Sequence, residues 1–219
     1  MRWIFTARML KFANMQVTGA SIPIEERYEK LSAAEWDGYG DKILELKPKK
    51  IVDIACGLGR VSAYIADQFK RADIPEPRFT MCDSDNSPAA RPEYGFKTSQ
   101  FYNSFVVMFE FLRKNGISNY EYVDVERPQD YELLDGRGDV IISMLGLGFH
   151  VPLADCIDDL YRMAREDTTI ILGIPSIEDM PDWEEEQIRE DLFSAWEVVD
   201  IKPEIRTHQT RIAIIGGKI

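Results

Sequence analysis

A glycine-rich corner between a strand and a helix constrains this chain more than any other segment. Residues 51–60 read Ile-Val-Asp-Ile-Ala-Cys-Gly-Leu-Gly-Arg, so a β-branched run containing Asp53 leads into Gly57 and Gly59. Glycines at such a corner let the backbone approach a ligand closely. An ordinary turn needs no acid four residues before its first glycine, and that acid can accept hydrogen bonds from a ribose hydroxyl or an amino group. The segment therefore predicts a ligand site.

The architecture around this corner follows from strand-length apolar runs that alternate with segments of helical period. Strands are expected at 50–54, 78–82, 120–125, 139–144, 168–174, near 196–201 and at 210–215. Helices are expected at 25–46 with a break at 38–40, and at 60–71, 100–114, 154–164 and 180–195, with a loop at 86–97. This alternation predicts an α/β fold with a doubly wound, mostly parallel sheet.

Length and charge narrow the class of partner. A chain of 219 residues fits one domain with some elaboration. Its net charge of -12 argues against a nucleic-acid partner, because a phosphate backbone would be repelled, and favours a small-molecule substrate. The three cysteines form no CxxC pair, which indicates a reducing compartment such as the cytoplasm, without a disulfide framework or zinc site. No apolar run is long enough for a transmembrane helix, and the oligomeric state stays open.

Residues 1–24 differ in charge from the rest of the chain. They hold Arg2, Arg8 and Lys11 and no acidic residue. An acid-free basic start is compatible with a transit peptide, and equally with an ordered arm or helix. We favour the arm, because organelle signals are richer in serine and arginine. Its apolar residues would then pack on the domain formed by residues 25–219: Trp3, Ile4, Phe5, Met9, Leu10 and Phe12.

The corner resembles the first motif of class I S-adenosylmethionine-dependent methyltransferases, which reads acid-x-x-x-Gly-x-Gly. A dinucleotide site competes at this level, but its fingerprint has a third small residue, usually glycine or alanine, where this chain has Ser62. The resemblance implies S-adenosylmethionine as cofactor and a Rossmann-like seven-stranded fold, mostly parallel with an antiparallel C-terminal strand. The helix beginning near Arg60 would offer backbone amides and a positive dipole end to the cofactor's carboxylate.

The resemblance also assigns acids at two further strand ends. An acid after the second strand would accept from the ribose hydroxyls, and we favour Asp83 over Asp85 because it lies nearer the end of the apolar run. Asp124, at the end of the third strand, would accept from the adenine amino group, or is a solvated strand-end acid. The predicted cofactor-binding set is Asp53, Ala55, Cys56, Gly57, Gly59, Asp83, Ser84, Asp124, Val125 and Met144.

The segment after the fourth strand would face the methyl group, because ligands bind beyond the carboxyl ends of such strands. It contains His150, one of two histidines, which could take a proton from an attacking hydroxyl or could simply cap the next helix. Its Gly-Phe-His-Val-Pro stretch, at 148–152, is similar to the Gly-Phe-His-Tyr-Pro of sugar O-methyltransferases. Candidate substrate residues, which are otherwise core or rim residues, are Tyr39, Tyr102 and Asn103.

Several alternatives share this pattern. An N-methyltransferase would have the same cofactor residues, a nicotinamide-dependent oxidoreductase would bind NAD(P), and a non-catalytic module would bind the cofactor without transferring a methyl group. No metal is predicted: Asp124, Asp139 and the acids at 184–186 have no spacing that requires one. The second histidine, His208, is assigned no role.

Overall fold

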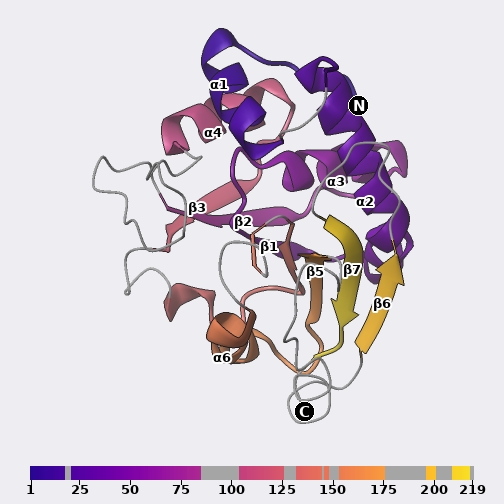
Figure 1. The fold of residues 1–219 in the computed structure, drawn as a ribbon. Coiled ribbons are helices and arrows are strands. Elements are labelled where there is room, and N and C mark those ends of the chain that lie inside the picture. The colour runs from indigo at the N-terminus through magenta and orange to yellow at the C-terminus, as the bar shows by residue number, and fades with distance from the viewer. Residues whose placement is uncertain are drawn as a thin grey trace.

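The computed structural model describes residues 1–17, 21–84, 104–125, 132–144, 146–147, 153–175, 196–200 and 209–217. Seven strands form one sheet in the order β3-β2-β1-β4-β5-β7-β6 (Figure 1). β7 runs antiparallel to both of its neighbours, whereas the pairs from β3 to β5 are parallel. The prediction of a mostly parallel sheet with an antiparallel C-terminal strand is confirmed. The strands are β1 (Lys50–Ile54), β2 (Arg78–Asp83), β3 (Tyr120–Asp124), β4 (Val140–Ser143), β5 (Thr169–Pro175), β6 (Trp196–Asp200) and β7 (Gln209–Ile215).

Helices cover both faces of the sheet. Successive residues of β1 point to opposite faces, so Ile51 lies in the core beneath the N-terminal helices, while Val52 and Ile54 lie in a second core that includes Leu160 of α6. The helices of the first face are α1 (Ala7–Gln16), α2 (Ile24–Leu46), α3 (Arg60–Arg71) and α4 (Phe105–Lys114). On the other face lie α6 (Leu153–Met163) and the short 3-10 helix η2 (Glu132–Leu134) (Figure 1).

The N-terminal residues belong to the first of these cores. Thr6 caps α1, and Trp3, Met9 and Phe12 are buried among residues of α2 and α4. The Trp3 ring meets Tyr28 of α2 edge to face, with 5.3 Å between ring centroids. This packing agrees with an ordered N-terminal helix, except that Ile4 is 45% exposed, contrary to its predicted burial. The domain boundary at residue 24 stays a prediction.

The predicted break in α2 is wrong. The helix is continuous from Ile24 to Leu46, through both glycines at 38 and 40. A side chain at Gly40 would collide with the Trp36 ring, so this glycine gives the indole room to lie along the helix. A glycine inside a helix costs about 1 kcal/mol relative to alanine, which tertiary packing can readily offset.

Element boundaries elsewhere follow the sequence pattern closely. β1 and α3 have the predicted limits, whereas the helix expected at 100–114 is described from Phe105. The expected loop at 86–97 and helix at 180–195 lie outside the described residues. Within the described part of the chain, no helix combines the length and apolar character needed to span a bilayer.

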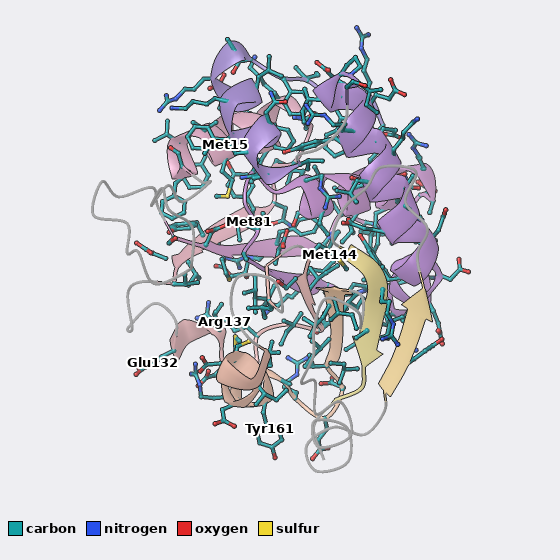
Figure 2. The ribbon with its side chains drawn as sticks, viewed as in Figure 1. Met15, Met81, Glu132, Arg137, Met144 and Tyr161 are labelled. Atoms are coloured by element: carbon teal, nitrogen blue, oxygen red, sulfur yellow. The ribbon has the colours of Figure 1, made fainter. Side chains whose placement is uncertain are left out.

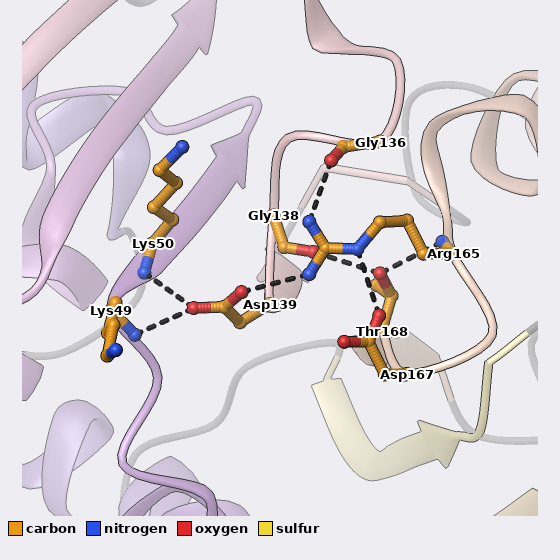
Figure 3. Close-up of polar contacts among 8 residues, drawn as sticks. All are labelled: Lys49, Lys50, Gly136, Gly138, Asp139, Arg165, Asp167 and Thr168. Atoms are coloured by element: carbon orange, nitrogen blue, oxygen red, sulfur yellow. Dashed lines mark hydrogen bonds and ion pairs between the residues drawn. The ribbon is translucent and has the colours of Figure 1, made fainter.

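A polar cluster holds together the amino ends of β1, β4 and β5 (Figure 3). Asp139 Oδ2 accepts from the backbone N–H groups of Lys49 and Lys50 at 2.7 and 3.0 Å. Its other oxygen, Oδ1, accepts from Arg165 Nη2 at 3.0 Å, and Arg165 also donates to the Gly136 carbonyl at 2.8 Å. Asp139 therefore joins the start of β1 to the segment that leads into β5, and we assign it a structural role.

Replacement of Asp139 by alanine should lower the free energy of unfolding by about 1–2 kcal/mol, because two backbone N–H groups and Arg165 lose their acceptor. Urea unfolding followed by circular dichroism measures this change. Asp167→Ala is the matched control: its carboxylate bonds Arg165 but is 76% exposed, so the loss should stay within about 0.5 kcal/mol. Equal losses in the two variants would contradict the structural role of Asp139.

Candidate functional site

The predicted site lies at the carboxyl edge of the sheet, where the strand order changes direction. Consecutive strands lead outward from β1 to β2 and β3 on one side, and from β4 to β5 on the other. Ligands of open α/β sheets bind in the crevice at such a switch point. The loops after β1 and β4 touch there, because a side chain at Gly146 would collide with the methyl group of Ala55.

The glycine corner, residues 55–59, has left-handed backbone at three positions: φ is 55° at Ala55, 57° at Gly57 and 84° at Gly59. A Cβ at Gly59 would lie 2.6 Å from Leu112 Cδ2, so core packing as well as backbone conformation requires glycine there. A Cβ at Gly57 would lie 2.8 Å from the side-chain amide carbon of Gln16. Both glycines thus make room for side chains of the protein itself.

The backbone N–H groups of the corner are bonded within the protein, and each of four consecutive ones has a different acceptor. These bonds commit the N–H groups of residues 56–59 to acceptors within the protein, whereas the amides that the sequence assigned to a ligand carboxylate are those at the start of α3, near Arg60. The four bonds are Cys56 N to the Cys82 carbonyl at 3.1 Å, Gly57 N to Asp83 Oδ2 at 2.7 Å, Leu58 N to Gln16 Oε1 at 3.2 Å, and Gly59 N to the Cys56 carbonyl at 2.8 Å.

Asp53 points inward, toward α3. It is 1% exposed, and its Oδ2 accepts from the Ser62 hydroxyl at 2.7 Å. Burial raises the pKa of Asp53 to about 7, although hydrogen bonds from the Ser62 side chain and backbone and the charge of Arg60 oppose this increase. Asp53 thus bonds Ser62 in the first turn of α3, and its contact with a ligand stays a prediction.

A buried ion pair ties α2 to the same corner. The Arg60 guanidinium donates to both carboxylate oxygens of Glu35, at 2.7 and 2.8 Å, and to the Ser32 hydroxyl at 2.9 Å. Glu35 is fully buried and Arg60 is 6% exposed. Burial disfavours the charged guanidinium, but the Glu35 carboxylate outweighs it and raises the pKa of Arg60. The Arg60 guanidinium therefore binds side chains of α2.

Two acids predicted from separate motifs meet at the ends of neighbouring strands. Asp83 and Asp124 are register partners in β2 and β3. Besides accepting from Gly57, Asp83 accepts from the Ser84 backbone N–H through Oδ1 at 2.8 Å, and its carbonyl accepts from Val125 N at 3.2 Å. The structure therefore joins Asp83 to the glycine corner and places Ser84, Asp124 and Val125 beside Asp83 at the ends of β2 and β3.

The remaining predicted cofactor residues are mostly buried. Met144, labelled in Figure 2, follows β4 and is 5% exposed. Cys56 is 9% exposed, its Sγ lies 3.6 Å from Met108 Sδ, and burial raises the pKa of its thiol well above the ordinary value. A buried, protonated thiol is a poor nucleophile, so we assign Cys56 a packing role in the wall of the site. Ala55 is exposed.

Tyr39 is a core residue, which corrects its prediction as a substrate residue. It lies within α2, is 2% exposed, and its ring meets Trp36 with 5.6 Å between centroids. Because α2 is continuous, Tyr39 is not at a helix start above the strand ends. The other candidates lie outside the described residues: His150, Tyr102, Asn103, Asp85 and His208.

The structure also separates the acids considered for a metal. Asp124 ends β3 at the carboxyl edge, whereas Asp139 precedes β4 at the amino edge and pairs with Arg165. Within the described ranges no group of three or more histidine, cysteine or acidic side chains could hold a metal ion.

Gln16, at the end of α1, is the site residue that sequence reasoning missed. No motif includes it, since it lies about 40 residues before the glycine corner. The available signal was the helical pattern of residues 3–12, which predicts that the N-terminal segment packs on the domain without showing where its last turn lies.

No protein-family model and no curated protein matches this sequence. Solved structures do match its fold. A methyltransferase from Geobacter sulfurreducens aligns with a TM-score of 0.52 and 15% identity over 97% of this chain and 87% of its own. The O-methyltransferase TomG from Streptomyces achromogenes, in complex with SAM, aligns with a TM-score of 0.52 and 11% identity over 98% and 91%. The chain shares the Rossmann-like fold of these methyltransferases.

Removal of the Asp53 carboxyl should change how stability depends on pH. The folded pKa of about 7 exceeds the ordinary 3.8, so the folded state binds more protons between these values. This group's contribution to stability is therefore complete below about pH 4 and is lost as pH rises toward 7. Relative to wild type, Asp53→Asn should gain stability over that window and level off above it, as measured by thermal melting from pH 4 to 8. Parallel profiles would contradict a protonated Asp53.

Proposed function

We propose that this protein is an S-adenosylmethionine-dependent methyltransferase that methylates an oxygen of a small molecule, such as a sugar hydroxyl. The observation that carries the proposal is the position of Asp83. It bonds the glycine corner, lies beside Asp124 in register, and does so at the switch point of the sheet. This is the edge at which an adenosine-containing ligand is expected to bind in open α/β sheets.

The residues at this edge fit the cofactor's adenosine portion. A carboxylate oxygen accepts more than one hydrogen bond, so Asp83 can hold the vicinal ribose hydroxyls while retaining the Gly57 N–H. Asp124 and Val125 are the candidates for the adenine edge, since they end the next strand. The exposed Ala55 and buried Met144 belong to the loops after β1 and β4, between which the reacting end would lie.

S-adenosylmethionine supplies, when bound, a methyl group on a sulfonium that is already a good leaving group. The tasks left to this chain are to orient the acceptor in line and to remove its proton. His150 is our candidate for the second task, because an imidazole can take up a proton near neutral pH. Its place after β4 supports this, since that segment leaves the carboxyl edge of the sheet.

The strand order supports a methyltransferase over a nicotinamide-dependent oxidoreductase. The dinucleotide-binding order is 3-2-1-4-5-6, whereas here β7 is inserted antiparallel between β5 and β6. Ser62, at the position of the fingerprint's third small residue, also bonds Asp53. We further propose a small-molecule acceptor and a cytoplasmic location, both from the acidic charge and the cysteine pattern.

Calorimetric titration with S-adenosylhomocysteine, with NAD as the control ligand, tests the proposal. We expect micromolar binding of the first ligand and none of the second. Asp83→Asn keeps an acceptor for the Gly57 N–H but loses the charge, and it should weaken binding at least tenfold. Binding of NAD alone, or of neither ligand, would reject the proposal. A screen of hydroxyl-bearing and amine-bearing acceptors with the loaded protein then separates O- from N-methylation.

Replacement of His150 by alanine should lower turnover of the acceptor found in that screen by roughly 10²–10⁴-fold, the usual contribution of a general base. Affinity for S-adenosylhomocysteine should change little, because the proton-transfer step does not contribute to cofactor binding. Turnover measured from pH 5 to 9 should lose its acidic limb in the variant. An equal loss of turnover and cofactor affinity would show that His150 is not the base.

A further inference from the structure

Asp53 is a buried carboxyl group that forms no ion pair among the described residues. It is 1% exposed, and its Oδ2 accepts from the Ser62 hydroxyl at 2.7 Å. The Arg60 guanidinium nearby is bonded to both carboxylate oxygens of Glu35 instead. Burial of a carboxylate with a neutral hydroxyl as its partner is costly, and a cation that approaches it would offset this cost.

Two charged groups act on Asp53 in opposite directions. Arg60 favours the ionised form, whereas Asp83 at the end of the neighbouring strand β2 disfavours it. Because burial outweighs the hydrogen bonds from Ser62 and the charge of Arg60, the pKa of Asp53 is raised to about 7. In the free protein this carboxyl is therefore balanced between its neutral and its charged form close to neutral pH.

The other ionisable groups around Asp53 supply no positive charge. Burial raises the pKa of each well above its ordinary value, so they stay neutral: Tyr39 on α2, Cys56 at the glycine corner and Cys82 on β2. The register partners of Asp53 are also uncharged, namely Met81 on β2 and Ile142 on β4. A positive charge brought to this part of the site by a ligand would therefore shift Asp53 toward its ionised form.

We propose that Asp53 releases a proton to solvent when the cationic portion of S-adenosylmethionine binds, so that affinity for the cofactor rises with pH. This inference rests on the proposed function. The O–H bond of the carboxyl group breaks, the carboxylate stays in the complex and the proton passes to the buffer. The place of Asp53 supports this coupling, since it lies in β1 two residues before the exposed Ala55, at the switch point of the sheet.

The coupling predicts how affinity depends on pH. A nearby cation lowers the pKa of a carboxyl group, so the complex binds fewer protons than the free protein at pH values just below 7. Affinity for S-adenosylhomocysteine, which keeps the cationic amino group, should therefore rise as pH increases toward 7 and level off above it. The increase from pH 6 to pH 8 should be roughly tenfold, because the ionised fraction of the free carboxyl group rises by about that factor.

Calorimetric titration in two buffers of different ionisation enthalpy measures the released proton directly. Binding of S-adenosylhomocysteine at pH 6 should release about one proton per ligand, and at pH 8 only about a tenth of one. The matched ligand is 5′-methylthioadenosine, which has the same nucleoside without the charged amino group. It should bind without release of a proton at either pH.

Three variants assign the proton to its group. Asp53→Asn cannot ionise, so D53N should bind S-adenosylhomocysteine with an affinity that does not change with pH, and should release no proton. Ser62→Ala removes a hydroxyl that lowers the pKa of Asp53, so the pH dependence should move to higher pH. Asp167→Asn is the matched control, because it makes the same change at a carboxyl group that is 76% exposed, and it should behave as wild type does.

The outcomes separate this inference from the proposed function. If wild type does not bind S-adenosylhomocysteine, both fail. If wild type binds it without releasing a proton at pH 6, the function stands and the inference fails. Release that persists in D53N would assign the proton to another group. Equal release with 5′-methylthioadenosine would reject the cation as its cause.

Loss of the release in D53N, with normal release in D167N, establishes the coupling. Thermal melting shows whether each variant is folded. If D53N does not fold, S62A decides the question by itself: a shift of the pH dependence to higher pH supports the role of Asp53, and an unchanged pH dependence rejects it.

Discussion

The hydrogen bond between the Gly57 amide and Asp83 joins the two motifs on which the site depends. It places the end of β2 against the glycine corner at 2.7 Å, and β2 in turn aligns Asp124 of β3 through the strand register. Because the next amide is bonded by Gln16, the corner also receives the last turn of α1. The glycine corner thus contacts β2 and α1, which are distant in the sequence, and both contribute to its geometry.

Buried charged side chains join α2 to α3 beside the glycine corner. Arg60 and Glu35 form a fully desolvated pair, and removal of one partner from such a pair typically costs about 3–5 kcal/mol because the other charge stays buried alone. Asp53 adds a buried carboxyl that is coupled to Arg60 and to Asp83. Replacement by apolar side chains could yield equal stability. We therefore assign the Arg60–Glu35 pair a role in orienting α2 relative to α3, and not mainly in stability.

Much of this organisation could be predicted from the sequence, because it depends on local pattern. β1 and α3 have the predicted limits since a β-branched run and an amphipathic period specify them. Asp83 and Asp124 could be brought together because parallel strands end at one edge of a sheet. Tyr39 was misplaced, since two nearby glycines suggested a break that packing against Trp36 overrides. Gln16 could not be found, because its contact depends on how α1 docks, which no local pattern encodes.

The hydrogen bonds of the carboxyl edge limit the kind of ligand that the glycine corner can hold. An acid on the ribose, as proposed for Asp83, also occurs in dinucleotide sites, so Asp83 alone does not distinguish the two kinds of cofactor. The difference lies in the corner itself. A dinucleotide site presents the backbone N–H groups of its glycine-rich turn to a pyrophosphate, whereas here those of residues 56–59 are bonded within the protein. The bonded corner therefore argues against a pyrophosphate more directly than the charge of the nearby acids does.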